Sequence, residues 1–178
     1  MRLFIAIQFD ETTKEAMLAV QDRLRKYGQG NFSRPENLHL TLHFLGEVAP
    51  QQVGRVKEAM DSELVPSMKI QFSHTGSFQR QGGNLWWLGI EPNPALIRLQ
   101  KSLGDQLQQR GVPVEQRRYS PHITLARQVI LQEKPDCNAL LETPFQTQVH
   151  SMSLMRSERI RGVLTYTEQY RVSAKEMP

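Results

Sequence analysis

Short apolar runs alternate with stretches of helical periodicity in the first third of the chain. Residues 3–9 form an apolar run that is typical of a buried strand. The residues that follow place apolar side chains at helical spacing as far as about Tyr27, and Gly28 and Gly30 are expected to end this helix. Residues 31–36 are predicted to be a loop that leads into the next strand.

The rest of the chain continues in the same way. Apolar stripes predict helices over residues 50–64 and 92–111. Between them, alternating strands over residues 68–72 and 85–90 flank turn residues 81–84, which predicts a hairpin. The other expected segments are a strand from Tyr119 to Ala126 or beyond, a loop with a short helical turn over 131–141, strands over 145–155 and 163–172, and a frayed tail from Ala174.

The order of these segments predicts an α+β fold. Hairpins rather than repeated βαβ crossovers connect the strands, so the pairing is expected to be antiparallel. In each half of the chain, strand, helix and strand follow one another, and the last strand contains the tripeptide His-x-Thr. This order is consistent with two pseudo-symmetric lobes around a cleft. The length suits a single domain, 1–178, made of two interleaved lobes.

Charge and cysteine content narrow the function classes. The 22 basic and 18 acidic residues give a net charge of +4, which suits a polyanionic partner without requiring one. The single cysteine, Cys137, excludes an internal disulfide and leaves no redox pair or metal knuckle. Since the chain also has no secretory segment and no apolar run of the ~18 residues that span a bilayer, we expect a cytoplasmic protein without a membrane partner. No interface signal is evident, so we expect a monomer.

Two copies of one short motif dominate the candidate chemistry. They are His39-Leu40-Thr41-Leu42 and His122-Ile123-Thr124-Leu125. With five His and nine Thr, a shuffled chain would contain only about 0.25 His-x-Thr triplets, so two copies exceed chance. Side chains at i and i+2 of a strand share a face. Each strand therefore presents an imidazole and a hydroxyl on one side and its leucine on the other.

The paired motifs resemble those of the 2H phosphoesterase superfamily. The longer run over residues 35–47 is similar to one branch, the RNA 2′,3′-cyclic phosphodiesterases, historically called 2′-5′ RNA ligases. Residues 2–7, Trp87-Leu88-Gly89 and Arg127 extend the resemblance over nearly the whole chain. It implies a bilobal LigT-like fold, with two antiparallel-sheet lobes, outer helices and a central cleft. It also implies hydrolysis of RNA 2′,3′-cyclic phosphate ends to 2′-phosphomonoesters, without metal or cofactor.

The four motif side chains suit a phosphodiester held between the two strands. One imidazole must be neutral to accept a proton and the other protonated to donate one, which a histidine pKa near 6.5 allows. The resemblance implies that His39 is the proton donor and His122 the proton acceptor. Thr41 and Thr124 are expected to bind nonbridging phosphate oxygens through their hydroxyl groups.

Arg127 is a further candidate for phosphate binding. A guanidinium three residues beyond Thr124 can donate two parallel hydrogen bonds to a phosphate. On a regular strand, that odd spacing directs the side chain away from the cleft, so this role requires a bend. Arg117 and Arg118 precede the second motif, where they either guide RNA or form a solvated basic loop.

The remaining histidines and the tryptophan pair can be interpreted either as structural or as functional residues. His43 shares a regular strand face with His39 and is expected at the rim of the cleft, where it could touch a neighbouring nucleotide. His74 and His150 have no companion motif and are predicted to lie at the surface or at strand edges. Trp86 and Trp87 are adjacent in a strand, so one is expected to point inward and the other outward.

Several functions remain open at this stage. The same groups would serve a phosphodiesterase for 2′,5′-linked oligonucleotides or a reversible 2′-5′ RNA ligase. A different class is an RNA-binding module without turnover, which would have no need for two titrating groups. A metallohydrolase would need clustered ligands, whereas the acidic residues here are scattered.

Overall fold

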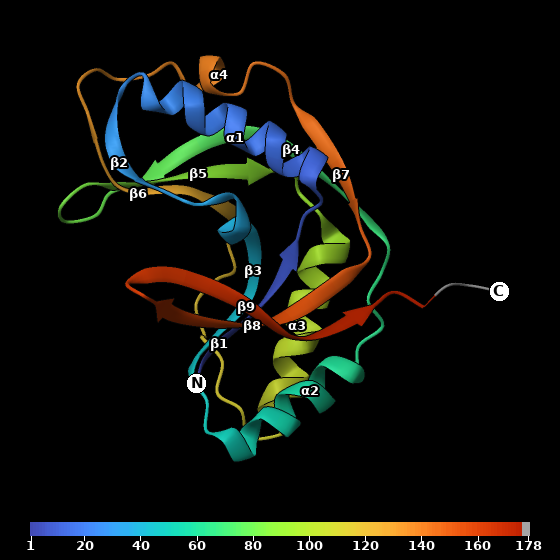
Figure 1. Cartoon of the computed structure of the whole chain (residues 1–178). Helices are drawn as coiled ribbons and strands as arrows, with labels where there is room; N and C mark the ends of the chain where they lie inside the picture. Colours follow the sequence, from blue (N-terminus) through green and yellow to red (C-terminus); the bar gives the residue numbers. More distant parts are fainter. Residues whose placement is uncertain (176–178) are drawn as a thin grey trace.

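In the computed structural model, the described residues 1–175 form one curled sheet with helices on its outer side (Figure 1). The end of the predicted frayed tail, 176–178, lies outside these residues. All the strand pairs are antiparallel, which confirms the predicted α+β class. The strands are β1 (Arg2–Gln8), β2 (Gly28–Phe32), β3 (His39–Glu47), β4 (Met68–Phe78), β5 (Asn84–Ile90), β6 (His122–Leu131), β7 (Phe145–Val149), β8 (Ser151–Ile160) and β9 (Val163–Ser173). The helices are α1 (Glu11–Arg25), α2 (Val53–Asp61), α3 (Pro94–Gln109) and α4 (Cys137–Leu140), with short 3₁₀ turns at Pro35–Asn37 and Pro50–Gln52.

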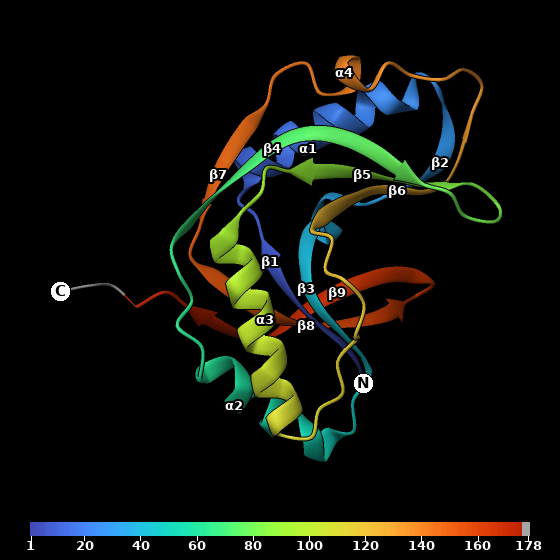
Figure 2. The ribbon, with the colours of Figure 1, turned by 180° about the vertical axis from the view of Figure 1, so that it is seen from behind.

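The sheet divides into two halves at its middle. The strand order is β7-β4-β5-β6-β3-β1-β8-β9, and β2 also pairs with β6. We call the half that contains β2, β4, β5, β6 and β7 the β6 lobe, and the half that contains β1, β3, β8 and β9 the β3 lobe. A single residue pair, Leu40 with Ile123, joins the two halves. Helices α1 and α4 pack on the β6 lobe, and α2 and α3 pack on the β3 lobe (Figures 1 and 2).

The chain crosses between the lobes several times. Strand β1 belongs to the β3 lobe, but the helix that follows it, α1, packs on the β6 lobe. Strand β5 belongs to the β6 lobe, whereas the next helix, α3, covers the β3 lobe. As a result, neither lobe is a continuous stretch of the sequence.

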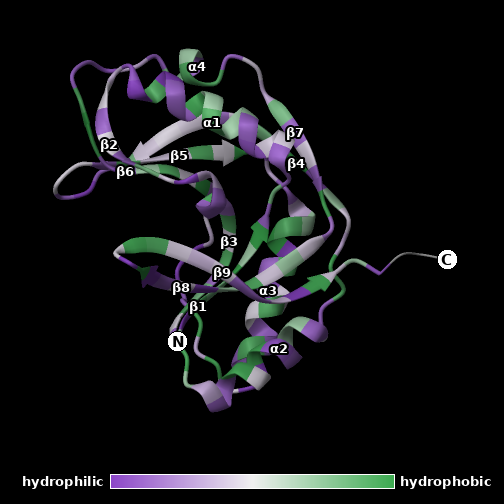
Figure 3. Ribbon diagram, in the orientation of Figure 1, coloured by the Kyte–Doolittle hydropathy of each residue, from purple (hydrophilic) through white to green (hydrophobic). Residues whose placement is uncertain are grey.

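Local sequence signals explain where the two long helices begin. The Asp10 carboxylate accepts a hydrogen bond from the Thr13 amide at 2.8 Å and caps α1. Asn93 caps α3 in the same way, through the amide of Leu96 at 3.1 Å, and Pro94 occupies the first turn. The apolar stripes of both helices are buried against the sheet, and Figure 3 shows how hydrophobic and hydrophilic turns alternate along α1 while β1 is largely hydrophobic. No helix within residues 1–175 has both the length and the hydrophobicity to cross a bilayer.

The predicted loop after the first helix is wrong in its first part. Residues 28–32 form strand β2, which pairs with β6. Its sequence, Gly-Gln-Gly-Asn-Phe, has little strand propensity. The strand forms because glycine allows a close approach: a Cβ atom at Gly28 would lie 2.2 Å from the carbonyl oxygen of Ile130. This pairing depends on β6, about a hundred residues away, and local patterning does not reveal it.

Two other predicted strands are wrong in extent. The predicted strand over 145–155 is two strands, because the chain leaves the β6 lobe at His150 and enters the β3 lobe. Strand β7 pairs with β4, whereas β8 pairs with β1 and β9. The first strand of the predicted hairpin, expected to end at Phe72, continues as far as Phe78. A register shift interrupts β4 between Phe72 and His74, and β8 buries four consecutive residues, so simple alternation does not show where a strand changes partner or ends.

Candidate active site

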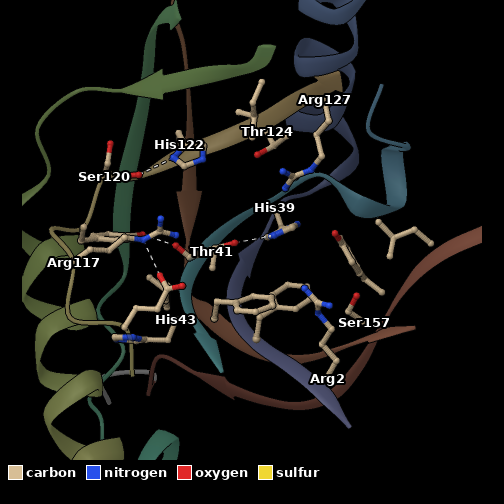
Figure 4. A pocket seen from close by; sticks show the side chains of 18 of the residues that line it. Arg2, His39, Thr41, His43, Arg117, Ser120, His122, Thr124, Arg127 and Ser157 are labelled. Atoms are coloured by element: carbon tan, nitrogen blue, oxygen red, sulfur yellow. Dashed lines mark hydrogen bonds and ion pairs between the residues drawn. The ribbon is translucent and has the colours of Figure 1, made fainter. Parts of the chain in front are cut away.

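The two motif strands lie next to each other in the middle of the sheet and border one large cleft. The intervening apolar residues, Leu40 and Ile123, are completely buried and pair with each other. The side chains on either side of them point the other way. The structure thereby brings together His39, Thr41, His122 and Thr124, which all line a cleft of about 1120 Å³ (Figure 4).

A β-bulge directs Arg127 into this cleft. On β5, Trp87 pairs with Thr124 but the adjacent Trp86 pairs with Ala126, so Leu125 is an extra residue in β6. Leu125 and Ala126 are both buried, and the side-chain alternation shifts by one position. Arg127 therefore returns to the cleft side, where it points toward the two histidines (Figure 4). The bulge is the bend that the odd spacing required.

The same irregularity occurs in β3, next to His43. Thr41 pairs with Ala6, but His43 pairs with the adjacent Ile5, so Leu42 is the extra residue. The bulge turns His43 off the face of the motif histidine and buries it to 6 % exposure. Its Nε2 atom lies 2.7 Å from the Gln100 carbonyl of α3. His43 still lines the cleft, where the sequence predicted it, but its ring is held by α3 rather than left free at the rim.

Backbone carbonyl groups fix how both motif histidines are oriented. The Nδ1 atom of His39 lies 2.7 Å from the Asn37 carbonyl, and that of His122 lies 2.7 Å from the Ser120 carbonyl. A carbonyl oxygen only accepts hydrogen bonds, so Nδ1 is the protonated nitrogen in the neutral ring. The Nε2 atoms are left for the cleft, and that of His39 accepts a hydrogen bond from the Thr41 hydroxyl at 2.9 Å. Sequence reasoning missed these partners because any residue type can supply a carbonyl.

Aromatic rings surround both imidazoles. The ring centroid of His39 lies 4.8 Å from that of Phe4 and 5.3 Å from that of Tyr166. Phe78 contacts His122 edge to face at a centroid distance of 5.4 Å. These rings come from β1, β9 and β4, which flank the motif strands or lie further away in the sheet. They restrict the rotation of the imidazoles and reduce their contact with water.

The two tryptophans divide as the sequence predicts. Trp86 is buried in the core at 5 % exposure. Trp87 faces the opposite side, with its ring centroid 6.4 Å from that of His122. A Cβ atom at Gly76 would lie 2.3 Å from the Trp87 indole, so this glycine makes room for the ring. Trp87 thereby supports the motif histidine from β5.

Burial and positive charge keep both imidazoles neutral in the free protein. Burial is the main cause that lowers the pKa of His39 to about 4, and the charges of Arg127 and His122 lower it further against the hydrogen bond to Asn37. The pKa of His122 is also lowered, first by burial and then by nearby arginines, while its hydrogen bond to Ser120 opposes the shift. An anion bound between these groups would favour the imidazolium form and raise both pKa values.

The cleft suits a polyanion. Seven arginines line it together with three glutamates: Arg2, Arg80, Arg117, Arg118, Arg127, Arg156 and Arg159, with Glu47, Glu115 and Glu158. Two of these arginines form ion pairs, Arg117 with Glu115 at 2.8 Å and Arg156 with Glu158 at 2.9 Å. Arg127 has no carboxylate oxygen within 4.0 Å in the described part of the chain. Its charge is available to an anionic ligand.

The described residues contain no group of metal ligands, and His74 and His150 lie outside the cleft. Among residues 1–175, no three side chains of His, Cys, Asp or Glu gather as a metal site would require. His74 and His150 are exposed, as predicted, and bond to Ser73 and Ser67 through their Nδ1 atoms at 2.8 and 3.2 Å.

Comparison with known proteins gives consistent similarities. Residues 12–161 match the model of the 2′-5′ RNA ligase superfamily. An RNA 2′,3′-cyclic phosphodiesterase of Thermotoga maritima is 34 % identical over 131 residues, 71 % of this chain and 70 % of that protein. The protein of the same name from Methanothermobacter thermautotrophicus is 30 % identical over 176 residues, which cover 94 % of this chain and 95 % of the relative. Among solved structures, Escherichia coli LigT complexed with 3′-AMP has a TM-score of 0.79 at 26 % identity, with 98 % of both chains covered.

Proposed function

The chain belongs to the 2′-5′ RNA ligase superfamily, and from this premise we propose that it hydrolyses RNA 2′,3′-cyclic phosphodiester ends to 2′-phosphomonoesters. One observation supports this function most directly. Carbonyl groups hold the Nδ1 atoms of His39 and His122, so both Nε2 atoms are available to one substrate in the cleft between β3 and β6. Two such nitrogens are what a proton transfer at each side of a phosphorus atom needs.

In the proposed complex, the cyclic phosphate lies between the two motif strands. The hydroxyl groups of Thr41 and Thr124 donate hydrogen bonds to its nonbridging oxygens, and the Arg127 guanidinium adds a charged, two-pronged contact. In the free protein the Thr41 hydroxyl donates to Nε2 of His39, and it is released to the phosphate when that nitrogen becomes protonated. These donors stabilise the charge that develops on the phosphoryl oxygens as water attacks.

His122 acts as the proton acceptor and His39 as the proton donor. The unprotonated Nε2 atom of His122 takes a proton from the attacking water as its oxygen bonds to phosphorus, and the P–O3′ bond breaks on the opposite side. Protonated Nε2 of His39 gives its proton to the departing O3′. The bound phosphate supplies the negative charge that allows His39 to be protonated near neutral pH, although its pKa in the empty cleft is about 4.

The proposed reaction needs no metal ion. The positive charge that a metal would supply comes from Arg127 and the protonated histidine. The donor set of the cleft supports this, because nitrogen donors predominate there and the three glutamates that line it form no cluster.

Phosphorus NMR of a short RNA that ends in a 2′,3′-cyclic phosphate tests this function. The protein is incubated with the RNA in EDTA beside the His39→Ala and His122→Ala variants, with His150→Ala as a control outside the cleft. We expect a 2′-monophosphate product that each motif variant reduces at least ~100-fold, the usual size of an acid–base contribution. Full activity in both motif variants would contradict the two-histidine mechanism, and loss of activity in EDTA would contradict metal independence.

The near symmetry of the two histidines also favours a second reaction. Each imidazole is held in the same way, so the pair can exchange roles, as microscopic reversibility requires for ligation through a 2′,5′ bond. The linkage of products from 2′,5′- and 3′,5′-linked oligonucleotides distinguishes hydrolysis of cyclic ends from cleavage or formation of 2′,5′ bonds. A monomeric state and a cytoplasmic location stay predictions.

A further inference from the structure

Four adjacent strands of the β3 lobe each contribute one side chain to the cleft on the side of Tyr166, whose ring contacts His39. They are Phe44 of β3, Arg2 of β1, Ser157 of β8 and Tyr166 of β9, and all four line the cleft. Ser157 pairs directly with Tyr166. Leu3 pairs with Arg156, so Arg2 and Ser157 occupy the next positions along β1 and β8. Figure 4 shows the Arg2 guanidinium and the Ser157 side chain close together. We call Arg2, Ser157 and Tyr166 the β1-β8-β9 row.

The charge of Arg2 is held in place without being neutralised. Its guanidinium carbon lies 5.1 Å from the centroid of the Phe44 ring, a contact that orients the group and leaves its hydrogen-bond donors free. No carboxylate oxygen of residues 1–175 lies within 4.0 Å of it. The two glutamates of the β3 lobe that line the cleft have other partners: Glu47 pairs with the N-terminal amine at 3.3 Å and Glu158 with Arg156.

The other two members of the row carry hydroxyl groups that can donate hydrogen bonds to a ligand. Ser157 presents a hydroxyl group, and burial raises the pKa of Tyr166, so its phenol stays protonated. The charges of Arg127 and Arg2 both act on that phenol. Arg127 also lowers the pKa of His39 and that of His122, although burial is the main cause of both shifts. The phenol is therefore within electrostatic range of both Arg127 at the motif site and Arg2.

We propose that Arg2, Ser157 and Tyr166 bind a second phosphate, the phosphodiester next to the terminal cyclic phosphate. One guanidinium and two hydroxyl groups form a set of donors suited to an anion. Arg2 lies two residues, about 6.5 Å, along β1 from Phe4, whose ring contacts His39. The subsite rests on the proposed function and narrows it: the preferred substrate is an oligonucleotide end rather than a cyclic mononucleotide.

Two substrates that share the same reacting group separate this subsite from the motif site. Adenosine 2′,3′-cyclic phosphate has one phosphate, and the dinucleotide ApA with a terminal 2′,3′-cyclic phosphate has two. Steady-state hydrolysis of both is measured for the wild type, Arg2→Gln, Ser157→Ala and Arg98→Gln. Arg98 is exposed on α3 outside the cleft, so its variant controls for the loss of one positive charge. Thermal unfolding followed by circular dichroism checks that each variant is folded.

The expected result is a selective loss on the dinucleotide. Arg2→Gln should lower its kcat/KM by about 10- to 100-fold, mainly through KM, since one charge-assisted contact is removed. Ser157→Ala should lower it about 3- to 10-fold. The mononucleotide should change by less than about twofold in both variants, and Arg98→Gln should resemble the wild type on both substrates.

Other outcomes would overturn the subsite. Equal losses on both substrates in Arg2→Gln would assign Arg2 to the reacting phosphate instead. An unchanged kcat/KM on the dinucleotide would leave the row without a ligand role. A wild-type protein that hydrolyses neither substrate would refute the proposed function itself, and the subsite with it.

Discussion

Single hydrogen bonds at the motif histidines determine which proton each ring can exchange. The carbonyl groups of Asn37 and Ser120 hold the protonated Nδ1 atoms. Only the Nε2 atoms are then left to meet a ligand, and they gain or lose charge in a cleft lined by arginines. Burial, and then the positive charge around the cleft, disfavour the imidazolium form that a proton donor needs. In the proposed mechanism the substrate anion reverses this preference, so acid catalysis is expected to depend on bound phosphate.

This dependence predicts different pH profiles for kcat/KM and kcat. In the free protein, the pKa of His39 is about 4 and that of His122 lies below its usual value of 6.5. The reactive form holds one proton in total, so kcat/KM is expected to fall about tenfold per pH unit above pH ~6.5. The alkaline limb of kcat should lie at higher pH, because bound phosphate raises the pKa of His39. Steady-state rates between pH ~5 and ~9 test this, and a kcat/KM that stays constant from pH ~6.5 to ~8.5 would contradict it.

The same buried imidazole should make stability depend on pH. The unfolded chain binds a proton at His39 near pH 6.5, whereas the folded chain does so only near pH 4. Stability that is present above pH ~6.5 is therefore lost as the pH falls toward 4. Between pH ~7.5 and ~5, the wild type should lose about 2 kcal/mol more unfolding free energy than His39→Gln.

Urea unfolding of both proteins at the two pH values measures this difference. His150→Gln is the matched control, since that histidine is exposed outside the cleft. An equal loss of stability in the wild type and in His39→Gln would show that the imidazole titrates in the same way in the folded and unfolded chain.

At the scale of secondary-structure elements, the two motif strands are built alike. Each has a motif histidine and threonine on the cleft side, followed by a bulge and two consecutive buried residues. The residue after the bulge then returns to the cleft: Phe44 in β3 and Arg127 in β6. The strands thus place Arg127, the residue proposed to bind phosphate, at one of two equivalent positions. At the other, Phe44 supports Arg2 from the neighbouring strand.

The pairing of β2 with β6 gives a prediction at the same scale. Gly28→Ala should destabilise the protein by about 1–3 kcal/mol, because the new Cβ atom would lie 2.2 Å from a backbone oxygen that cannot move freely. Gly54→Ala is the matched control: Gly54 is exposed in α2, and a Cβ atom there would meet nothing within 4 Å, so alanine should be neutral or stabilise by up to about 1 kcal/mol. Urea unfolding of both variants tests the pair. Equal stability of the two variants would contradict the close approach in β2.

At the scale of the whole molecule, the chain crosses between the lobes so often that neither lobe can be separated from the other. Helix α1 follows a strand of the β3 lobe and packs on the β6 lobe, and α3 does the reverse. The main apolar cluster contains buried residues of β1, β3, β5 and β6 and extends through both lobes. We therefore propose that the chain folds as one domain of two interleaved lobes.

One cooperative unfolding transition is the expected consequence. Both tryptophans lie in β5 of the β6 lobe, so their fluorescence reports on that lobe, whereas far-ultraviolet circular dichroism reports on both. The two signals should give the same urea midpoint and the same slope. Distinct midpoints would show that the lobes unfold separately.

The sequence by itself determined the elements that rest on local periodicity, and with them the centre of the site. The helices α1 and α3, strand β1 and the two motif strands follow from the spacing of apolar residues and from capping residues. Because Thr41 follows His39 by two residues, their side chains share one face in any extended strand. The alternation is a property of the chain within a few residues, so no tertiary information was needed.

Only the tertiary structure decided which side chains join that centre. The bulges that bring Arg127 into the cleft and bury His43 against α3 depend on how β6 and β3 pair with β5 and β1. The same holds for the glycine-rich strand β2 and for the change of lobe at His150. Backbone hydrogen bonds between residues far apart in the sequence set these features, and such bonds leave little trace in local composition.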